Sequence, residues 1–127
     1  MVVMELLQVA QHADDLDRAA AFYSDVLGCE LIARFDPPGL VFFRLGDTRL
    51  LVDKGAPSAL IYLKVDDVDE TAEKLRTAGV TIDTEPHGIF VDNDGTFGEP
   101  GLEERMMFIR DSEGNLVGLA SRNPASI

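Results

Sequence analysis

The stretch ADDLDRAA at residues 13–20 returns as VDDVDETA at residues 65–72, with the same offset at every position. Three aspartates and one alanine coincide, and Leu16 aligns with Val68. An apolar run precedes each copy, over residues 6–10 and 60–65. The chain therefore contains a repeated unit, and units of half a domain must pack against one another to bury their apolar faces.

Each copy of the repeat opens a predicted helix. The first helix is expected over residues 15–27 and the second over 67–78, each ending before a glycine, Gly28 or Gly79. Glycine readily adopts the left-handed conformation that follows a helix end. The aspartates at both helix starts cap free N–H groups and complement the helix dipole, which explains them without a metal.

Strand patterns follow each helix. After the first helix they cover residues 29–35, 41–45 and 49–52, and after the second they cover residues 80–84, 105–109 and 116–120. Gly and Asp at the breaks are typical of hairpin turns. Each half is thus β-α-β-β-β, and the fold class is α+β. We expect one domain over residues 1–127, with module one at about 1–55 and module two at about 58–122.

Composition excludes several classes of partner. The chain has 127 residues, which is the size of one domain, with 11 basic and 23 acidic residues and a net charge of −12. Such a charge argues against nucleic acid or an anionic membrane as a partner. No apolar run is long enough to cross a bilayer, and residues 1–10 lack the basic start of a signal peptide. We therefore expect a cytoplasmic protein.

Three motifs resemble those of the vicinal oxygen chelate superfamily, which includes glyoxalase I, extradiol dioxygenases, methylmalonyl-CoA epimerase, and fosfomycin- and bleomycin-resistance proteins. They are DLDRAAAFY at 15–23 with VLG at 26–28, VDDV at 65–68, and FIRDSEGNL at 108–116, which is similar to the family's D-P-D-G-N turn. The resemblance implies two βαβββ modules in tandem, whose curved mixed sheets form a cup. It also implies a homodimer, and it does not imply one reaction, because this fold hosts many.

Catalytic members of the superfamily hold one divalent metal in the cup. The resemblance places the four ligand positions at Gln8, Leu51, Leu60 and Gly118. Leucine has no donor atom, glycine has no side chain, and one glutamine oxygen does not hold a divalent ion. We therefore expect no metal at these positions and no cofactor.

A displaced site is the alternative that the sequence leaves open. His12 lies on the same strand face as Gln8, because side chains alternate along a strand. His87 follows the strand after the second helix, with Glu85 two residues before it. If His12 and His87 meet in space with a carboxylate, they can bind a divalent metal. Without a metal, His87 can act as a general base that Glu85 orients.

Alternation along the strands also predicts the lining of the cup. It is mainly apolar with a few polar groups, as in small-molecule sites, and the glycine at position 118 is expected to leave space. The predicted lining is Gln8, Ala10, His12, Arg49, Leu51, Asp53, Leu60, Tyr62, Lys64, Leu116, Gly118 and Ala120, to which the resemblance adds Met106 and Phe108. The alternative is a closed core between the sheets, against which the polar residues on this face argue.

The segment at residues 88–101 is acidic and rich in glycine, and it contains Phe90 and Phe97. It is expected to be a long loop that serves as a lid or an interface arm, or else a mobile surface hairpin.

The leading hypothesis is a metal-free protein that binds or sequesters a small organic ligand, as bleomycin-resistance proteins do. Gln8, His12, Tyr62 and His87 would give specificity; Leu51, Leu60, Met106 and Phe108 would give contact area beside Gly118. The second hypothesis is a lyase, isomerase or dioxygenase that uses His12 and His87, or His87 with Glu85. The third is a regulatory or interaction domain whose cup is filled by its own side chains.

Overall fold

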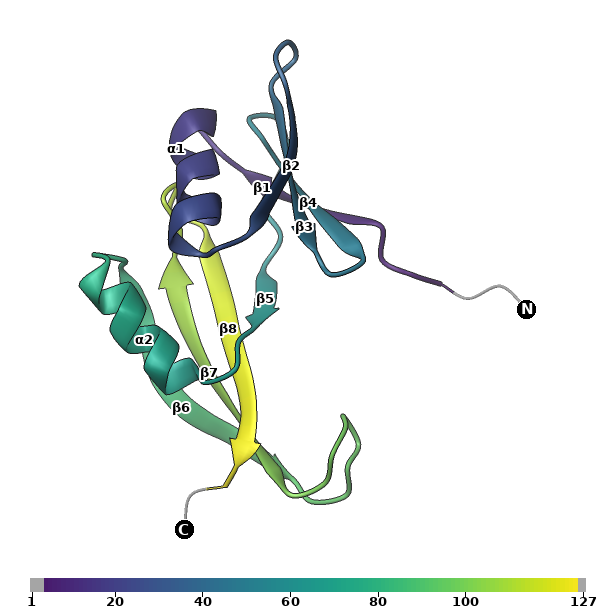
Figure 1. The fold of residues 1–127 in the computed structure, drawn as a ribbon, viewed down its shortest axis with the longest axis vertical. Helices are drawn as coiled ribbons and strands as arrows, with labels where there is room; N and C mark the ends of the chain where they lie inside the picture. The colour runs from purple at the N-terminus through teal and green to yellow at the C-terminus, as the bar shows by residue number, and fades with distance from the viewer. Residues whose placement is uncertain (1–3, 126–127) are drawn as a thin grey trace. The chain divides into compact units, whose positions relative to one another are not determined.

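The computed structural model describes residues 4–125 and contains two compact units (Figure 1). The first comprises Met1–Ala59 with Asp111–Asn115, and the second comprises Leu60–Arg110 with Leu116–Ile127. Each unit contains one four-stranded mixed sheet and one helical segment. This confirms the α+β fold of tandem βαβββ modules. Within residues 4–125, no helix has the length and apolar character to span a membrane.

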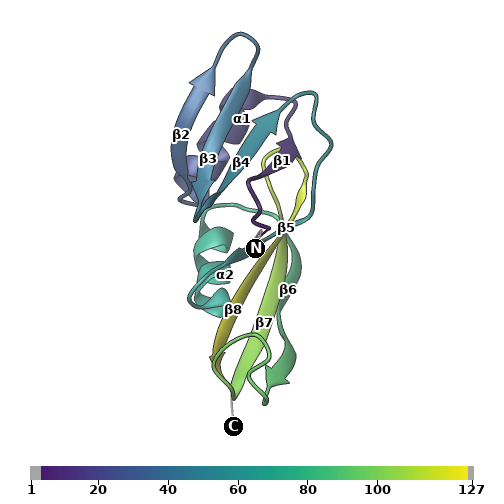
Figure 2. The same cartoon turned by 90° about the vertical axis from the view of Figure 1, so that its right-hand side faces the viewer.

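The first unit contains β1 (Gln8–His12), β2 (Glu30–Phe35), β3 (Leu40–Leu45) and β4 (Thr48–Asp53) in the order β1-β4-β3-β2. β1 pairs parallel with β4, and the other pairs are antiparallel. The helix α1 (Leu16–Ala21) lies behind β3 and β4 in Figure 2. The core between this helix and the sheet contains Tyr23, Val41, Phe43, Leu50 and Val52, all fully buried.

The second unit contains β5 (Ile61–Lys64), β6 (Ile82–Asp92), β7 (Leu102–Arg110) and β8 (Leu116–Pro124) in the order β5-β8-β7-β6. Here β5 pairs parallel with β8. The helix α2 (Val68–Thr77) packs on β6, β7 and β8. Its buried residues meet a sheet face that carries Met107, Ile109, Val117 and Leu119.

Both helices begin as the repeat predicts. The Asp15 carboxylate accepts a hydrogen bond from the Arg18 N–H, and the Asp67 carboxylate accepts from the Asp69 and Glu70 N–H groups. The first helix differs from the prediction of one continuous α-helix over 15–27. After α1 it widens into the π-helix η1 (Phe22–Val26), in which the Leu27 N–H bonds to the Phe22 carbonyl. Both aromatic residues that open this turn, Phe22 and Tyr23, are buried, which the wider turn accommodates.

The first five residues of the predicted loop at 88–101 are strand, which corrects the boundary of β6. β6 continues to Asp92, and Phe90 pairs with Glu104 across the hairpin. The remaining loop is tied to the strand end, because the Asp92 carboxylate accepts hydrogen bonds from the Thr96 and Phe97 N–H groups at 2.9 Å. Those bonds, together with Arg122, lower the pKa of Asp92.

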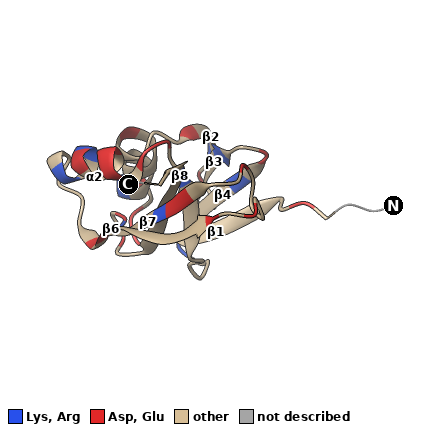
Figure 3. Cartoon of the chain, turned by 90° about the horizontal axis from the view of Figure 1, so that it is seen from below, with Lys and Arg blue, Asp and Glu red and all other residues tan. Residues whose placement is uncertain are grey.

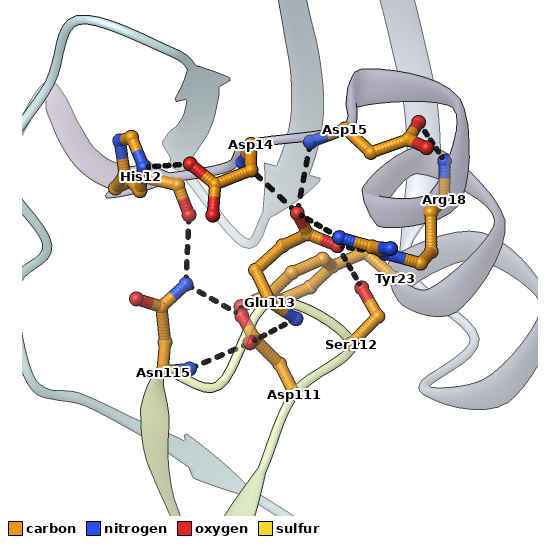
Figure 4. Close-up of polar contacts among 9 residues, drawn as sticks. All are labelled: His12, Asp14, Asp15, Arg18, Tyr23, Asp111, Ser112, Glu113 and Asn115. Carbon is orange, nitrogen blue, oxygen red and sulfur yellow. Dashed lines mark hydrogen bonds and ion pairs between the residues drawn. The ribbon is translucent and has the colours of Figure 1, made fainter.

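The turn Asp111–Asn115 organises the polar interior of the first unit (Figure 4). The buried Tyr23 hydroxyl donates to the Asp111 carboxylate at 2.7 Å. Burial is the main cause that raises the pKa of Tyr23, and the charge of Asp111 adds to it. Asn115 donates to the His12 carbonyl at 2.8 Å, so the turn also holds the end of β1.

Glu113 is the most heavily bonded side chain in this turn (Figure 4). Its fully buried carboxylate accepts from the backbone N–H groups of Asp14 and Asp15, both at 2.9 Å, and from the guanidinium of Arg18 at 2.7 and 3.0 Å. These donors all favour the ionised carboxylate, with Arg18 the largest cause. They hold the pKa of Glu113 at about 2, below its usual 4.5.

We expect Glu113→Gln to lower the free energy of unfolding at pH 7 by about 1.5–3 kcal/mol, the usual contribution of a charge-assisted hydrogen bond. Folding lowers the pKa of this carboxyl group, so the group stabilises the folded protein at any pH above the pKa that it has in the unfolded chain. The stabilisation is lost as the pH falls through the pKa of the group in the folded protein. The difference between wild type and variant should therefore shrink between about pH 4.5 and pH 2. Urea denaturation over this range measures it. Glu99→Gln, at an exposed loop position, is the control. A difference that does not change with pH would contradict the assignment.

Candidate functional site

Each sheet has one face that packs on its helix and one face that does not, which we call the open face. On the first sheet, the register pairs Gln8 with Arg49, and Ala10 with Leu51. The neighbouring residues of β4, Leu50 and Val52, are buried under the helix. The open face of the first sheet thus carries Gln8, Ala10, His12, Arg49, Leu51 and Asp53, in agreement with strand alternation.

The open face of the second sheet carries most of the remaining predicted residues. The register runs from Tyr62 through Gly118 to Phe108, and from Ala120 through Met106 to His87. Tyr62 remains 54% exposed. Leu60 lies just before β5 and is 47% exposed.

Gly118 does not leave the space that the sequence suggests, because the Tyr62 ring fills it. A Cβ atom at position 118 would lie 2.6 Å from the Tyr62 Cδ2 atom and 3.2 Å from the Phe108 Cε1 atom. The two rings meet edge to face, with their centroids 5.9 Å apart. The absence of a side chain at Gly118 thus lets an aromatic pair lie directly on the sheet.

The four positions that the resemblance assigns to metal ligands do not have side chains that fit a divalent ion. Leu51, Leu60 and Gly118 offer no donor atom. The Gln8 Oε1 atom accepts a hydrogen bond from the Arg49 Nε atom at 2.6 Å. The positive charge of Arg49 beside this oxygen disfavours a metal cation there. Within residues 4–125, no three or more His, Cys, Asp or Glu side chains are grouped closely enough to hold a metal ion.

The two histidines lie in different units, and each has a local partner. The His12 Nε2 atom donates to the Asp14 carboxylate at 2.8 Å, and this bond raises the pKa of His12. The His87 Nδ1 atom donates to the backbone carbonyl of Glu85 at 2.9 Å.

Glu85 contacts His87 through its backbone carbonyl and not through its carboxylate. Both carboxylate oxygens of Glu85 accept from the Arg76 guanidinium, at 2.8 and 2.9 Å, and this lowers the pKa of Glu85. Glu85 lies within a register irregularity of β6 between Thr84 and His87, and its carboxylate pairs with Arg76 of α2. Only the main chain of Glu85 orients the imidazole.

Phe42 also lies on the open face and was not predicted there from the sequence. The Arg49 guanidinium lies over its ring, 5.7 Å from the centroid, and Phe35 contacts the same ring edge to face. The signal was present, since Phe42 alternates with the buried Val41 and Phe43. The proximity of Phe42 to Arg49 depends on the register between β3 and β4, which cannot be derived from the sequence alone.

The family profile of the Glyoxalase/Bleomycin resistance protein/Dioxygenase superfamily matches residues 5–119. The chain belongs to this superfamily. Comparison with curated proteins gives no match. Superfamily membership agrees with the sheet order of both modules. It does not determine which ligand is bound or which reaction is catalysed, because this fold hosts many functions.

Solved structures of superfamily proteins are similar over nearly the whole chain. Lactoylglutathione lyase from Agrobacterium tumefaciens is 28% identical, with 92% of each chain covered and a TM-score of 0.69. The antibiotic-binding protein TnmS3 from Streptomyces sp. CB03234 is 22% identical, with 98% of this chain and 99% of that chain covered and a TM-score of 0.68. UcmS2 is 23% identical, with a TM-score of 0.70 and coverage of 94% and 98%. Likeness below 25% identity shows the fold alone.

We expect Gly118→Ala to displace the Tyr62 ring, because the new methyl group cannot lie 2.6 Å from a ring carbon. The chain has only two tyrosines, so NMR of the tyrosine ring protons resolves the effect. Tyr62 signals should shift as the ring leaves Phe108, and Tyr23 signals should not. Gly55→Ala is the control, since its nearest atom would be 3.8 Å away. Unchanged Tyr62 signals would refute the close packing of this ring on Gly118.

Proposed function

We propose that this protein binds a small, partly aromatic or apolar organic ligand on the open face of its second sheet, without a metal. The observation that carries the proposal is the Tyr62–Phe108 pair lying over Gly118. At one of the positions where the family's catalytic members hold their metal, this chain presents an aromatic surface. Aromatic side chains supply large contact area and prefer edge-to-face or offset contacts with other rings.

Exposure and composition of this face support the proposal. Tyr62 and Leu60 are about half exposed, and the Tyr62 ring contacts the partly buried Phe108. Isolated exposed apolar residues are ordinary, but a contiguous apolar surface with polar groups at its margin is typical of a binding site. Lys64 and His87 supply such polar groups, since each is in the row of β-sheet partners that contains Met106.

Binding is also the activity named for TnmS3, which is described as an antibiotic-binding protein. That relative supports the class of function, and the aromatic pair of this chain supports the chemistry of the ligand. Sequestration of a ligand requires affinity and exclusion of water, and it requires no Lewis acid. This agrees with the four predicted ligand positions, where the only side-chain donor atom is the Gln8 oxygen, which is bonded to Arg49.

An enzymatic role for His87 is the second candidate. The observation that favours it is the bond from its Nδ1 atom to the Glu85 carbonyl, which orients the imidazole ring. In that case a bound ligand would be converted, and His87→Ala would abolish conversion while the fold remains. Recovery of unchanged ligand after prolonged incubation, measured by mass spectrometry, separates binding from catalysis.

The neutral fluorophore N-phenyl-1-naphthylamine should bind saturably, and Tyr62→Ala should weaken it about tenfold, because loss of an aromatic contact and its buried area is worth about 1.4 kcal/mol. Fluorescence titration gives both dissociation constants. Phe97→Ala removes another exposed aromatic ring, at 69% exposure, and is the control. Equal affinity of wild type and Tyr62→Ala, or equal loss in the control, would argue against this surface.

We also propose that the protein is a homodimer, because exposed apolar residues outside the proposed ligand surface remain on both units, among them Leu31, Phe35, Ile89 and Val91. Light scattering coupled to size-exclusion chromatography should give twice the chain mass at micromolar concentration. A single-chain mass at all concentrations would contradict it.

A further inference from the structure

The open face of the first sheet has a row of polar residues that cross all four strands. The register pairs Gln8 with Arg49, Arg49 with Arg44, and Arg44 with Glu30. We call these four residues the polar row. Two arginines therefore stand directly opposite each other at its centre, where side-chain bases lie about 5 Å apart. Figure 3 shows basic positions on both β3 and β4.

Like charges in directly opposed positions destabilise a sheet. The ends of the polar row are occupied, since Arg49 donates to the Gln8 oxygen at 2.6 Å and Arg44 contacts the Glu30 carboxylate at 3.4 Å. Within the described residues, no carboxylate bridges the two guanidinium groups. An anion placed between them would remove the repulsion and accept charge-assisted hydrogen bonds from both sides.

Arg49 is exceptional among the arginines of this acidic protein. Every other arginine has a carboxylate within ion-pair distance, although the chain has 23 acidic and 11 basic residues. Among residues 4–125, Arg49 has no ion pair, and its contacts are the neutral Gln8 oxygen and the Phe42 ring. A guanidinium held in place by neutral groups keeps its charge available to a ligand.

A second row lies beside the polar row and is entirely apolar. It runs from Ala10 through Leu51 and Phe42 to Ala33. Two residues along a strand separate the rows, which is about 7 Å. The Phe42 ring borders both rows, because Arg49 lies over it and Phe35 packs against it from the apolar side.

We propose that the open face of the first sheet is a binding site for an organic anion that has a planar apolar body. Arg49 and Arg44 bind its carboxylate, sulfonate or phosphate group, and Phe42 and Leu51 contact its body. This site goes beyond the surface around Tyr62, because it lies in the other unit and selects for charge. The protein's net charge of −12 repels anions in general, so affinity for one must come from such a local cationic pair.

Two dyes that differ in one group test this site. 8-Anilinonaphthalene-1-sulfonate carries a sulfonate on the same ring system as the neutral N-phenyl-1-naphthylamine. We expect Arg49→Gln and Arg44→Gln each to raise the dissociation constant of the sulfonate dye about tenfold or more, the usual effect of losing a charge-assisted hydrogen bond. The affinity for the neutral dye should stay the same. Added NaCl should weaken only the sulfonate dye.

Two further variants control for net charge and for folding. Arg34→Gln removes the same charge from the opposite face of this sheet, where Arg34 pairs with Asp17 of α1, and it should leave the sulfonate dye unaffected. Arg49→Lys keeps the charge without the fork of donors, so it should bind the dye with intermediate affinity. Far- and near-ultraviolet circular dichroism checks that each variant is folded.

The site is refuted if the sulfonate dye does not bind saturably, or if Arg49→Gln and Arg34→Gln affect it equally. It is also refuted if the arginine variants lose both dyes alike. If Tyr62→Ala weakens the neutral dye while the arginine variants leave the sulfonate dye unchanged, the proposed function stands and this site alone fails.

Discussion

Each module has four strands and one helix, so its own residues can cover only one face of its sheet. The covered faces contain the buried aromatic and aliphatic residues, such as Phe43 in the first unit and Met107 in the second. The open faces are built differently, with apolar residues set among Gln8, Arg49, Tyr62 and Lys64. Each module therefore packs its helix on one face of its sheet, and the binding sites that we propose use the other face.

The resemblance assigns the metal ligands of the superfamily's catalytic members to positions on the open faces, and this chain has other residues at those positions. At Gln8, the one donor oxygen is bonded to a guanidinium. At Gly118, the space for a ligand side chain is filled by the Tyr62 ring. The first sheet has the Arg49 guanidinium over the Phe42 ring near these positions, and the second sheet has the edge-to-face pair of Tyr62 and Phe108. Both replacements favour recognition of an organic molecule over coordination of an ion.

The fold could be predicted from the sequence because its signals are local. The repeated D-D-x-D motif marks both helix starts, and alternation identifies which strand residues share a face. The π-turn at Phe22, the full length of β6 and the ring over Gly118 were missed, because they depend on tertiary packing. The sequence predicted that Glu85 orients His87, but it could not show which atoms of Glu85 do so. The backbone carbonyl of Glu85 contacts the imidazole, while its carboxylate forms a bidentate pair with Arg76. The opposition of Arg44 and Arg49 depends on the register, which only the structure gives.

The claim that this superfamily member functions without a metal can be tested directly by its metal content. Untagged protein would be offered Ni, Zn, Mn and Fe, desalted, and analysed by inductively coupled plasma mass spectrometry. We predict far less than one metal ion per chain for every metal, because three of the four family positions lack a donor atom and the fourth is bonded to Arg49. About one ion per chain, retained through desalting, would contradict this and would make His12 and His87 the first residues to replace.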